Sequence, residues 1–124
     1  KSPSFLSDAI CYNACKLALD TSANGIIGMT QSGYTGFMLS SYRPKSFLYI
    51  FTKEKSLVNQ LSLSWGVRAF FYDEEESLDD IFFDQIDILK ERGFITTGDV
   101  LVSTGSTPVH LHLPTNVIKI GTVE

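Results

Sequence analysis

Short apolar runs alternate with amphipathic stretches along this chain, and this alternation limits the possible folds more than any other feature. The runs lie at residues 26–29, 47–51, 67–72, 99–103 and 117–120. The runs at residues 26–29 and 47–51 contain no charged residue, which is typical of strands that are covered on both faces. Helical spacing between the runs predicts four helices. The first begins at Ser4 or Ser7 and ends at Asn24-Gly25, the second surrounds residues 37–39, and the third and fourth span residues 53–63 and 78–92.

Strands and helices alternate three times, which predicts a parallel sheet with helices on both faces. Residues 104–116 join the last two strands and show no helical pattern, whereas a parallel return needs a crossover that is usually helical. The last strand is therefore expected to be antiparallel. The predicted fold is α/β, a three-layer α/β/α domain over residues 1–124, with five mostly parallel strands.

Composition limits the class of protein. Hydrophobic residues make up 44% of the 124 residues and charged residues 19%, as in a globular domain, and the net charge is -4. Scattered lysines and arginines on an acidic chain argue against a nucleic-acid partner. The sequence contains neither a run long enough to span a bilayer nor a signal peptide, so we predict a cytoplasmic protein with no membrane partner. Because residue 1 is Lys, we expect a piece of a longer chain.

The most informative polar segment directly follows the first predicted strand. It reads Thr30-Gln31-Ser32-Gly33-Tyr34-Thr35 and precedes a predicted helix. A helix start at the carboxyl end of a parallel strand presents free N–H groups to an anion, and glycine allows a close approach. Spacing alone leaves two interpretations open: an anion cradle, or a helix that Ser32 or Thr35 merely caps.

The cysteines and histidines offer weaker candidates. Cys11 and Cys15 lie four residues apart on a predicted helix, where two ligands do not close a zinc site, so we interpret them as small core residues. His110 and His112 lie in the loop before the last strand without an evident third metal ligand. If that loop closes over the cradle, either histidine could bring a pH-dependent positive charge to the anion. Trp65 is interpreted as a core or interface residue rather than a platform for a ligand.

Several short segments, in this order, resemble the C-terminal domain of pyruvate kinase. They are Thr30-Gln31-Ser32-Gly33-Tyr34-Thr35, Ser41-Tyr42-Arg43-Pro44, Thr52-Lys53-Glu54, Leu61-Ser62-Leu63-Ser64-Trp65-Gly66-Val67, Thr97-Gly98-Asp99-Val100-Leu101-Val102 and Thr115-Asn116. Each segment is weak alone, but together they cover nearly the whole chain.

The resemblance implies a regulatory and assembly domain without catalytic residues. The parent enzyme would transfer phosphate from phosphoenolpyruvate to ADP in glycolysis, with magnesium and potassium, on a barrel domain that is absent here. No cofactor is expected on this fragment, which is expected to be inactive alone. The expected partners are the remaining domains of the chain and further copies of it, in a tetramer whose dimer contact uses the last strand and first helix. The alternative is a free-standing anion- or phosphometabolite-binding module of the same fold.

The resemblance also assigns candidate effector residues. Thr30, Gln31, Ser32, Gly33, Tyr34 and Thr35 correspond to the phosphate-binding turn, and Gly105, Ser106, His110 and His112 to the effector loop. The chain departs from bisphosphate-responsive members, because Gln31, Tyr34 and Ile81 stand where those members place cationic grips, and residues 73–76 are acidic. We therefore expect a sugar monophosphate or inorganic phosphate as the effector, since charge-assisted hydrogen bonds are the strong ones.

Overall fold

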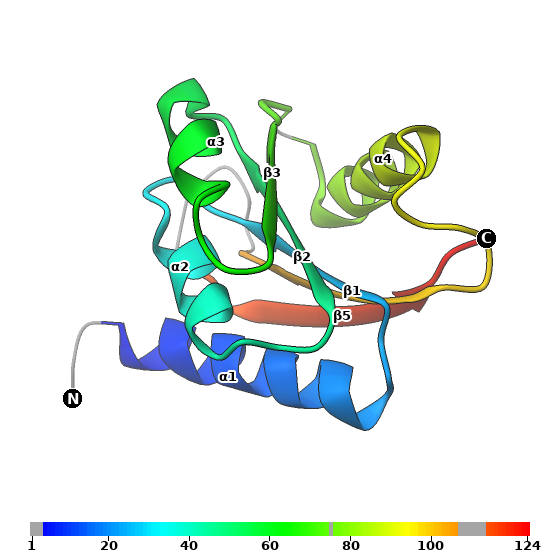
Figure 1. Ribbon diagram of the computed structural model, residues 1–124, viewed down its shortest axis with the longest axis horizontal. Helices are drawn as coiled ribbons and strands as arrows, with labels where there is room; N and C mark the ends of the chain where they lie inside the picture. The colour runs from blue at the N-terminus through cyan, green and yellow to red at the C-terminus, as the bar shows by residue number, and fades with distance from the viewer. Residues whose placement is uncertain (1–3, 75, 107–113) are drawn as a thin grey trace.

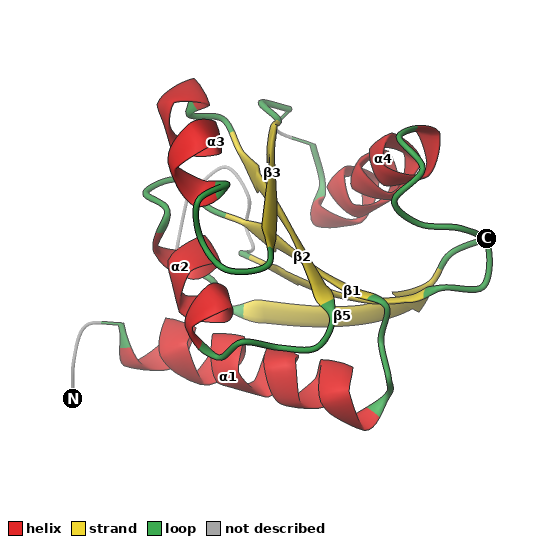
Figure 2. Cartoon of the chain, viewed as in Figure 1, coloured by secondary structure: helices red, strands yellow, loops and turns green. Residues whose placement is uncertain are grey.

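Strands and helices alternate along the chain as the apolar runs predict. A computed structural model describes residues 4–74, 76–106 and 114–124, and in these residues it shows five strands and four helices (Figures 1 and 2). In chain order they are α1 (Phe5–Asp20), β1 (Gly25–Met29), α2 (Tyr34–Ser41), β2 (Phe47–Thr52), α3 (Lys55–Leu61), β3 (Val67–Phe71), α4 (Leu78–Glu91), β4 (Val100–Gly105) and β5 (Val117–Thr122).

The strands form a single sheet in the order β3-β2-β1-β4-β5. Strands β1 to β4 are parallel, and β5 runs antiparallel to β4, which confirms the predicted direction of the last strand. The chain moves from β1 outward through β2 to β3, and α4 then carries it back to the other side of β1. The direction of winding thus changes between β1 and β4, and ligands of open α/β sheets bind outside the carboxyl ends of the strands at such a point.

Helices cover the sheet on both faces, so the fold has the predicted three layers (Figure 1). Successive strand residues alternate between the two faces. In β1, Ile26 packs in the core under α1, α2 and α3, whereas its neighbour Ile27 packs in the core under α4. Both residues are fully buried, which explains why the strand reads as an uninterrupted apolar run.

Two details differ from the sequence prediction. The first helix ends at Asp20 rather than at Asn24-Gly25, and Asn24 instead joins the sheet, where its Oδ1 accepts a hydrogen bond of 2.8 Å from the Val100 N–H. Trp65 is 47% exposed, with the Arg43 guanidinium over its ring, which rules out the core alternative and leaves the interface alternative as a prediction. Ile81, which stands where bisphosphate-responsive members place a cationic grip, is fully buried in the core under α4.

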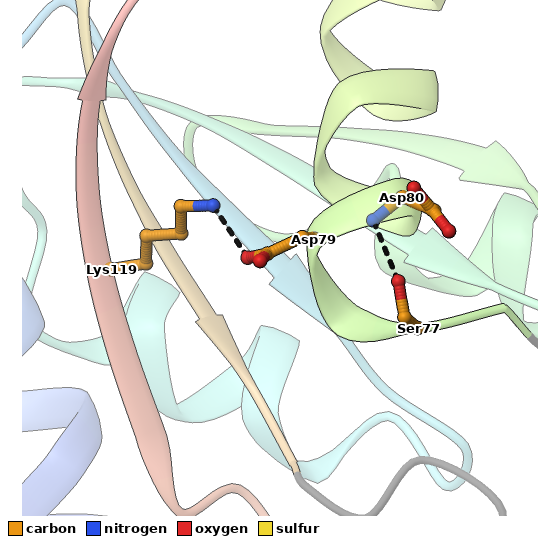
Figure 3. A network of polar contacts seen from close by, with 4 residues as sticks. All are labelled: Ser77, Asp79, Asp80 and Lys119. Atoms are coloured by element: carbon orange, nitrogen blue, oxygen red, sulfur yellow. Dashed lines mark hydrogen bonds and ion pairs between the residues drawn. The ribbon is translucent and has the colours of Figure 1, made fainter.

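Helix α4 is fixed at its first turn to the edge strand β5. Lys119 of β5 reaches Asp79 with a Nζ–Oδ1 distance of 2.8 Å, and its ammonium also lies over the rings of Phe82 and Phe83. Ser77 caps the helix, because its Oγ accepts the Asp80 N–H at 3.2 Å (Figure 3). These contacts hold the start of α4 beside the carboxyl ends of the parallel strands.

Candidate functional site

The segment between β1 and α2 forms a tight turn that its own side chains support. Gly33 is the N-cap of α2 and has a φ of 96°, a conformation that favours glycine. Its N–H donates to Thr30 Oγ1 at 2.9 Å, and the Tyr34 N–H approaches Ser32 Oγ at 3.4 Å. Two hydroxyls from within the turn therefore accept the N–H groups of the N-cap and of the first residue of α2. Neither Ser32 nor Thr35 is the cap of α2: the N-cap is Gly33, which has no side chain, and Ser32 only accepts the Tyr34 N–H from within the turn.

Thr35 instead pairs with a residue from the far end of the chain. Its hydroxyl lies 2.8 Å from the hydroxyl of Thr115, which directly precedes the short segment leading into β5. Both side chains are buried. A single hydrogen bond between two hydroxyls uses one O–H, so the second O–H of the pair still needs an acceptor. No acceptor for it appears among the described residues.

A cavity of about 420 Å³ opens beside this turn, at the carboxyl ends of the parallel strands. Five of the six predicted cradle residues line it: Thr30, Gln31, Ser32, Tyr34 and Thr35. The sixth, Gly33, shapes the turn without lining the cavity. Phe51, Tyr72 and Leu78 form an apolar part of the wall, and Thr115 contributes its hydroxyl.

The charges on the cavity wall are few and unevenly placed. Lys53, which follows β2, is the one cation among the described lining residues. Asp73 and Glu74, which follow β3, also line the cavity and are exposed. Ile81 does not line it, so the absence of charge at that core position does not affect a ligand. The expectation of weak bisphosphate binding therefore rests on the uncharged Gln31 and Tyr34 and on the acidic residues Asp73 and Glu74, which all line the cavity.

Two tyrosines at the cavity are held by carboxylates. The Tyr34 hydroxyl donates to Asp8 Oδ1 of α1 at 2.5 Å, and this hydrogen bond raises the pKa of the phenol. The Tyr72 hydroxyl donates to Asp84 Oδ2 of α4 at 3.0 Å, and burial together with this bond raises the pKa of Tyr72. Both phenols therefore stay neutral near pH 7 and tie α1 and α4 to the cavity wall.

The predicted effector loop is described only in part. Gly105 is the last residue of β4, and both Ser106 and Pro114 line the cavity. His110 and His112 lie outside the described residues, so their predicted contribution stays a prediction. In the described part of the chain, no three His, Cys, Asp or Glu side chains come together as a possible metal site. Cys11 is buried in the core under α1, and Cys15 packs against the same cluster, as predicted.

The sequence missed two features of this region. Thr115 pairs with Thr35 at the site, although it lies 80 residues further along the chain. The only sequence feature that pointed to Thr115 was the Thr115-Asn116 segment of the family resemblance. Three cations that look scattered in the sequence, Lys16, Arg43 and Lys45, gather around a second hollow of about 740 Å³ beside α1. Lys16 lies 3.6 Å from Asp20 there, which offsets part of the positive charge.

Comparisons with known proteins agree on one family. Residues 8–121 match the family model described as the pyruvate kinase alpha/beta domain. A pyruvate kinase of Clostridium acetobutylicum is 33% identical over 118 residues, which are 95% of this chain and 25% of that protein. The pyruvate kinase of Lactobacillus delbrueckii subsp. bulgaricus is 28% identical over 93% of this chain and 20% of its own length.

Solved structures show the same fold. A crystal structure of a pyruvate kinase from Cryptosporidium parvum superposes with a TM-score of 0.85 at 22% identity, over 100% of this chain and 24% of the other. The chain thus spans about a quarter of this neighbour and of the first of the relatives. No helix in the described part of the chain combines the length and the apolar character needed to cross a membrane.

Proposed function

The chain belongs to the pyruvate kinase alpha/beta domain family, and from that membership we propose that it is the regulatory and assembly domain of a pyruvate kinase. On this proposal, residues 1–124 form one domain of a longer chain, and phosphate transfer from phosphoenolpyruvate to ADP in glycolysis takes place on the remaining domains. The fragment alone is then inactive. Magnesium and potassium bind outside it, and the whole enzyme works in the cytoplasm.

The regulatory part of the proposal is a phosphate cradle at residues 30–35. It is supported by one observation above all, the surplus of buried hydroxyl donors at the cavity. Thr30 accepts a hydrogen bond from the Gly33 N–H, and its own O–H has no acceptor among the described residues. The hydrogen bond between Thr35 and Thr115 uses one of their two O–H groups, so the other O–H also has no acceptor among the described residues. Buried donors need acceptors, and a phosphate group offers acceptor oxygens at the start of a helix, where the dipole favours an anion.

Calorimetry with inorganic phosphate tests the cradle directly. Thr30→Val and Thr35→Val each remove a hydroxyl at nearly constant volume, and we expect each to weaken phosphate binding about tenfold, the loss of a hydrogen bond to a charged group. Ser62→Ala is the matched control, because it removes an exposed hydroxyl at the end of α3 whose partner is the Val58 C=O. Equal affinities in the threonine variants and in the wild type would rule the cradle out.

The assembly part concerns the edge strand β5 and helix α1. Ile118 packs in the core under α1, and Ile120, two residues further along the strand, projects from the same face and is 45% exposed. Helix α1 exposes large apolar side chains as well: Phe5, Leu6, Tyr12 and Leu19. An open strand edge beside apolar side chains is a surface that natural proteins cover, and a two-fold contact between copies would cover it.

A further inference from the structure

The cavity has two chemically different ends. Hydroxyl donors from Thr30, Thr35 and Thr115 lie at the end next to β1. The carboxylates of Asp73 and Glu74 follow β3, which is separated from β1 by β2 alone. Neighbouring strands lie about 4.8 Å apart, so the two ends are separated by roughly 10 Å. A ligand that spans the cavity therefore meets donors at one end and anions at the other.

From this polarity, and resting on the proposed phosphate cradle, we propose that the effector is a zwitterionic phosphate monoester. Its phosphate occupies the turn at residues 30–35, and a protonated amino group at its other end faces Asp73 and Glu74. The two carboxylates attract such a group, whereas they repel a second phosphate. Among the described lining residues Lys53 is the one cation, against the two carboxylates of Asp73 and Glu74, so their charges sum to a net negative charge.

Size and wall chemistry agree with this ligand. A cavity of about 420 Å³ lies within the range of small-molecule sites. Between its polar ends the wall is apolar, with contributions from Phe51, Tyr72 and Leu78. The Tyr72 hydroxyl is already engaged with Asp84, so the middle of the cavity offers contact surface rather than charge. A sugar ring or a short carbon chain between the phosphate and the ammonium suits such a wall.

Two sugar phosphates that differ in one group provide the test. Glucosamine 6-phosphate carries an ammonium group where glucose 6-phosphate carries a hydroxyl, on the ring carbon opposite the one that bears the phosphate arm. By calorimetry at pH 6.5, we expect the wild-type chain to bind the amino sugar about three- to tenfold more tightly, a modest factor because exposed charge pairs are weak. Fructose 1,6-bisphosphate should bind more weakly than either.

The double variant Asp73→Asn/Glu74→Gln should bring the ratio of the affinities for glucosamine 6-phosphate and glucose 6-phosphate close to one. Its affinity for inorganic phosphate should stay the same or increase. Asp87→Asn/Glu91→Gln is the matched control, because it changes the net charge equally at exposed positions of α4 that do not line the cavity. A ratio near one in the wild type, or a ratio that survives in Asp73→Asn/Glu74→Gln, would overturn the zwitterionic ligand alone. Absence of binding by inorganic phosphate and both esters would overturn the cradle together with it.

Discussion

Gly33 makes the turn of the candidate site possible for two separate reasons. Its φ of 96° lies in the left-handed region, and a Cβ on it would come within 2.7 Å of the Phe37 ring. We expect Gly33→Ala to lower the free energy of unfolding by about 2–3 kcal/mol, the sum of backbone strain and overpacking. Urea denaturation measures this loss, and phosphate calorimetry on the folded variant should show weaker binding.

A variant at Gly98 distinguishes backbone strain from overpacking. Its φ is 95°, almost the same as that of Gly33, but a Cβ there would find no atom within 4 Å. Gly98→Ala should therefore cost only the backbone part, about 1 kcal/mol, and should leave phosphate binding unchanged. Equal losses in the two variants would mean that the contact with Phe37 does not matter.

The two cysteines predict how stability depends on pH. Burial, with a smaller contribution from Cys15, raises the pKa of Cys11 from 9.0 to about 12, and burial raises that of Cys15 to about 11. In the unfolded chain both thiols ionise first, so a rise in pH above about 9 favours unfolding. The stabilisation that the neutral thiols give is full below pH 9 and is lost as the pH rises toward 11–12.

Urea denaturation at several pH values checks this sign. Between pH 9 and 11 the wild type should lose about 1 kcal/mol per pH unit for each thiol, beyond the loss from other groups. In the Cys11→Ala/Cys15→Ala variant that extra slope should disappear, although its stability near pH 7 is lower. Parallel pH profiles for the two proteins would contradict the prediction.

At the scale of the element, sequence reasoning succeeded where local pattern decides and failed where distant residues decide. The apolar run at residues 26–29 predicted β1 to within one residue of Gly25–Met29. The end of α1 was placed four residues too late, at Asn24-Gly25, because that pair resembles a helix stop. In the fold, Asn24 instead binds Val100, 76 residues away, and no local pattern carries that information.

Strand β5 carries the prediction about assembly. If β5 and α1 form the two-fold contact, Ile120→Lys places a charge in an apolar interface and should convert dimers or tetramers to smaller species. Light scattering after size-exclusion chromatography would show the change in mass. Leu63→Lys is the control, since Leu63 is 88% exposed in the turn before β3 and should not change the mass. A wild type that stays monomeric at high concentration would remove the proposed contact.

At the scale of the whole molecule, the sequence located the candidate site but not its walls. A polar segment after a buried strand was enough to indicate residues 30–35, because parallel topology fixes where strand ends meet. The partner hydroxyl of Thr115 and the acidic rim after β3 come together only through tertiary folding. Ile81 shows a limit of the resemblance: it stands where bisphosphate-responsive members place a cationic grip, and the fold buries it completely.

The proposed cradle also predicts a link between anion binding and global stability. The cavity is built from segments far apart in the chain, with Thr30, Tyr72 and Thr115 on its wall, and so exists only in the folded state. A ligand that binds only the folded state, at a concentration of ten times its Kd, adds about 1.4 kcal/mol to the free energy of unfolding, or about 5 °C to Tm for a domain of this size.

Phosphate also stabilises proteins by general exclusion from their surfaces, an effect that grows steadily with concentration. In thermal denaturation, the Tm of the wild type should rise with phosphate concentration by a component that saturates, in addition to the steady increase. The Tm of the Thr30→Val/Thr35→Val variant should show only the steady increase. Identical concentration curves in both proteins would show that phosphate stabilises this fold without occupying the cradle.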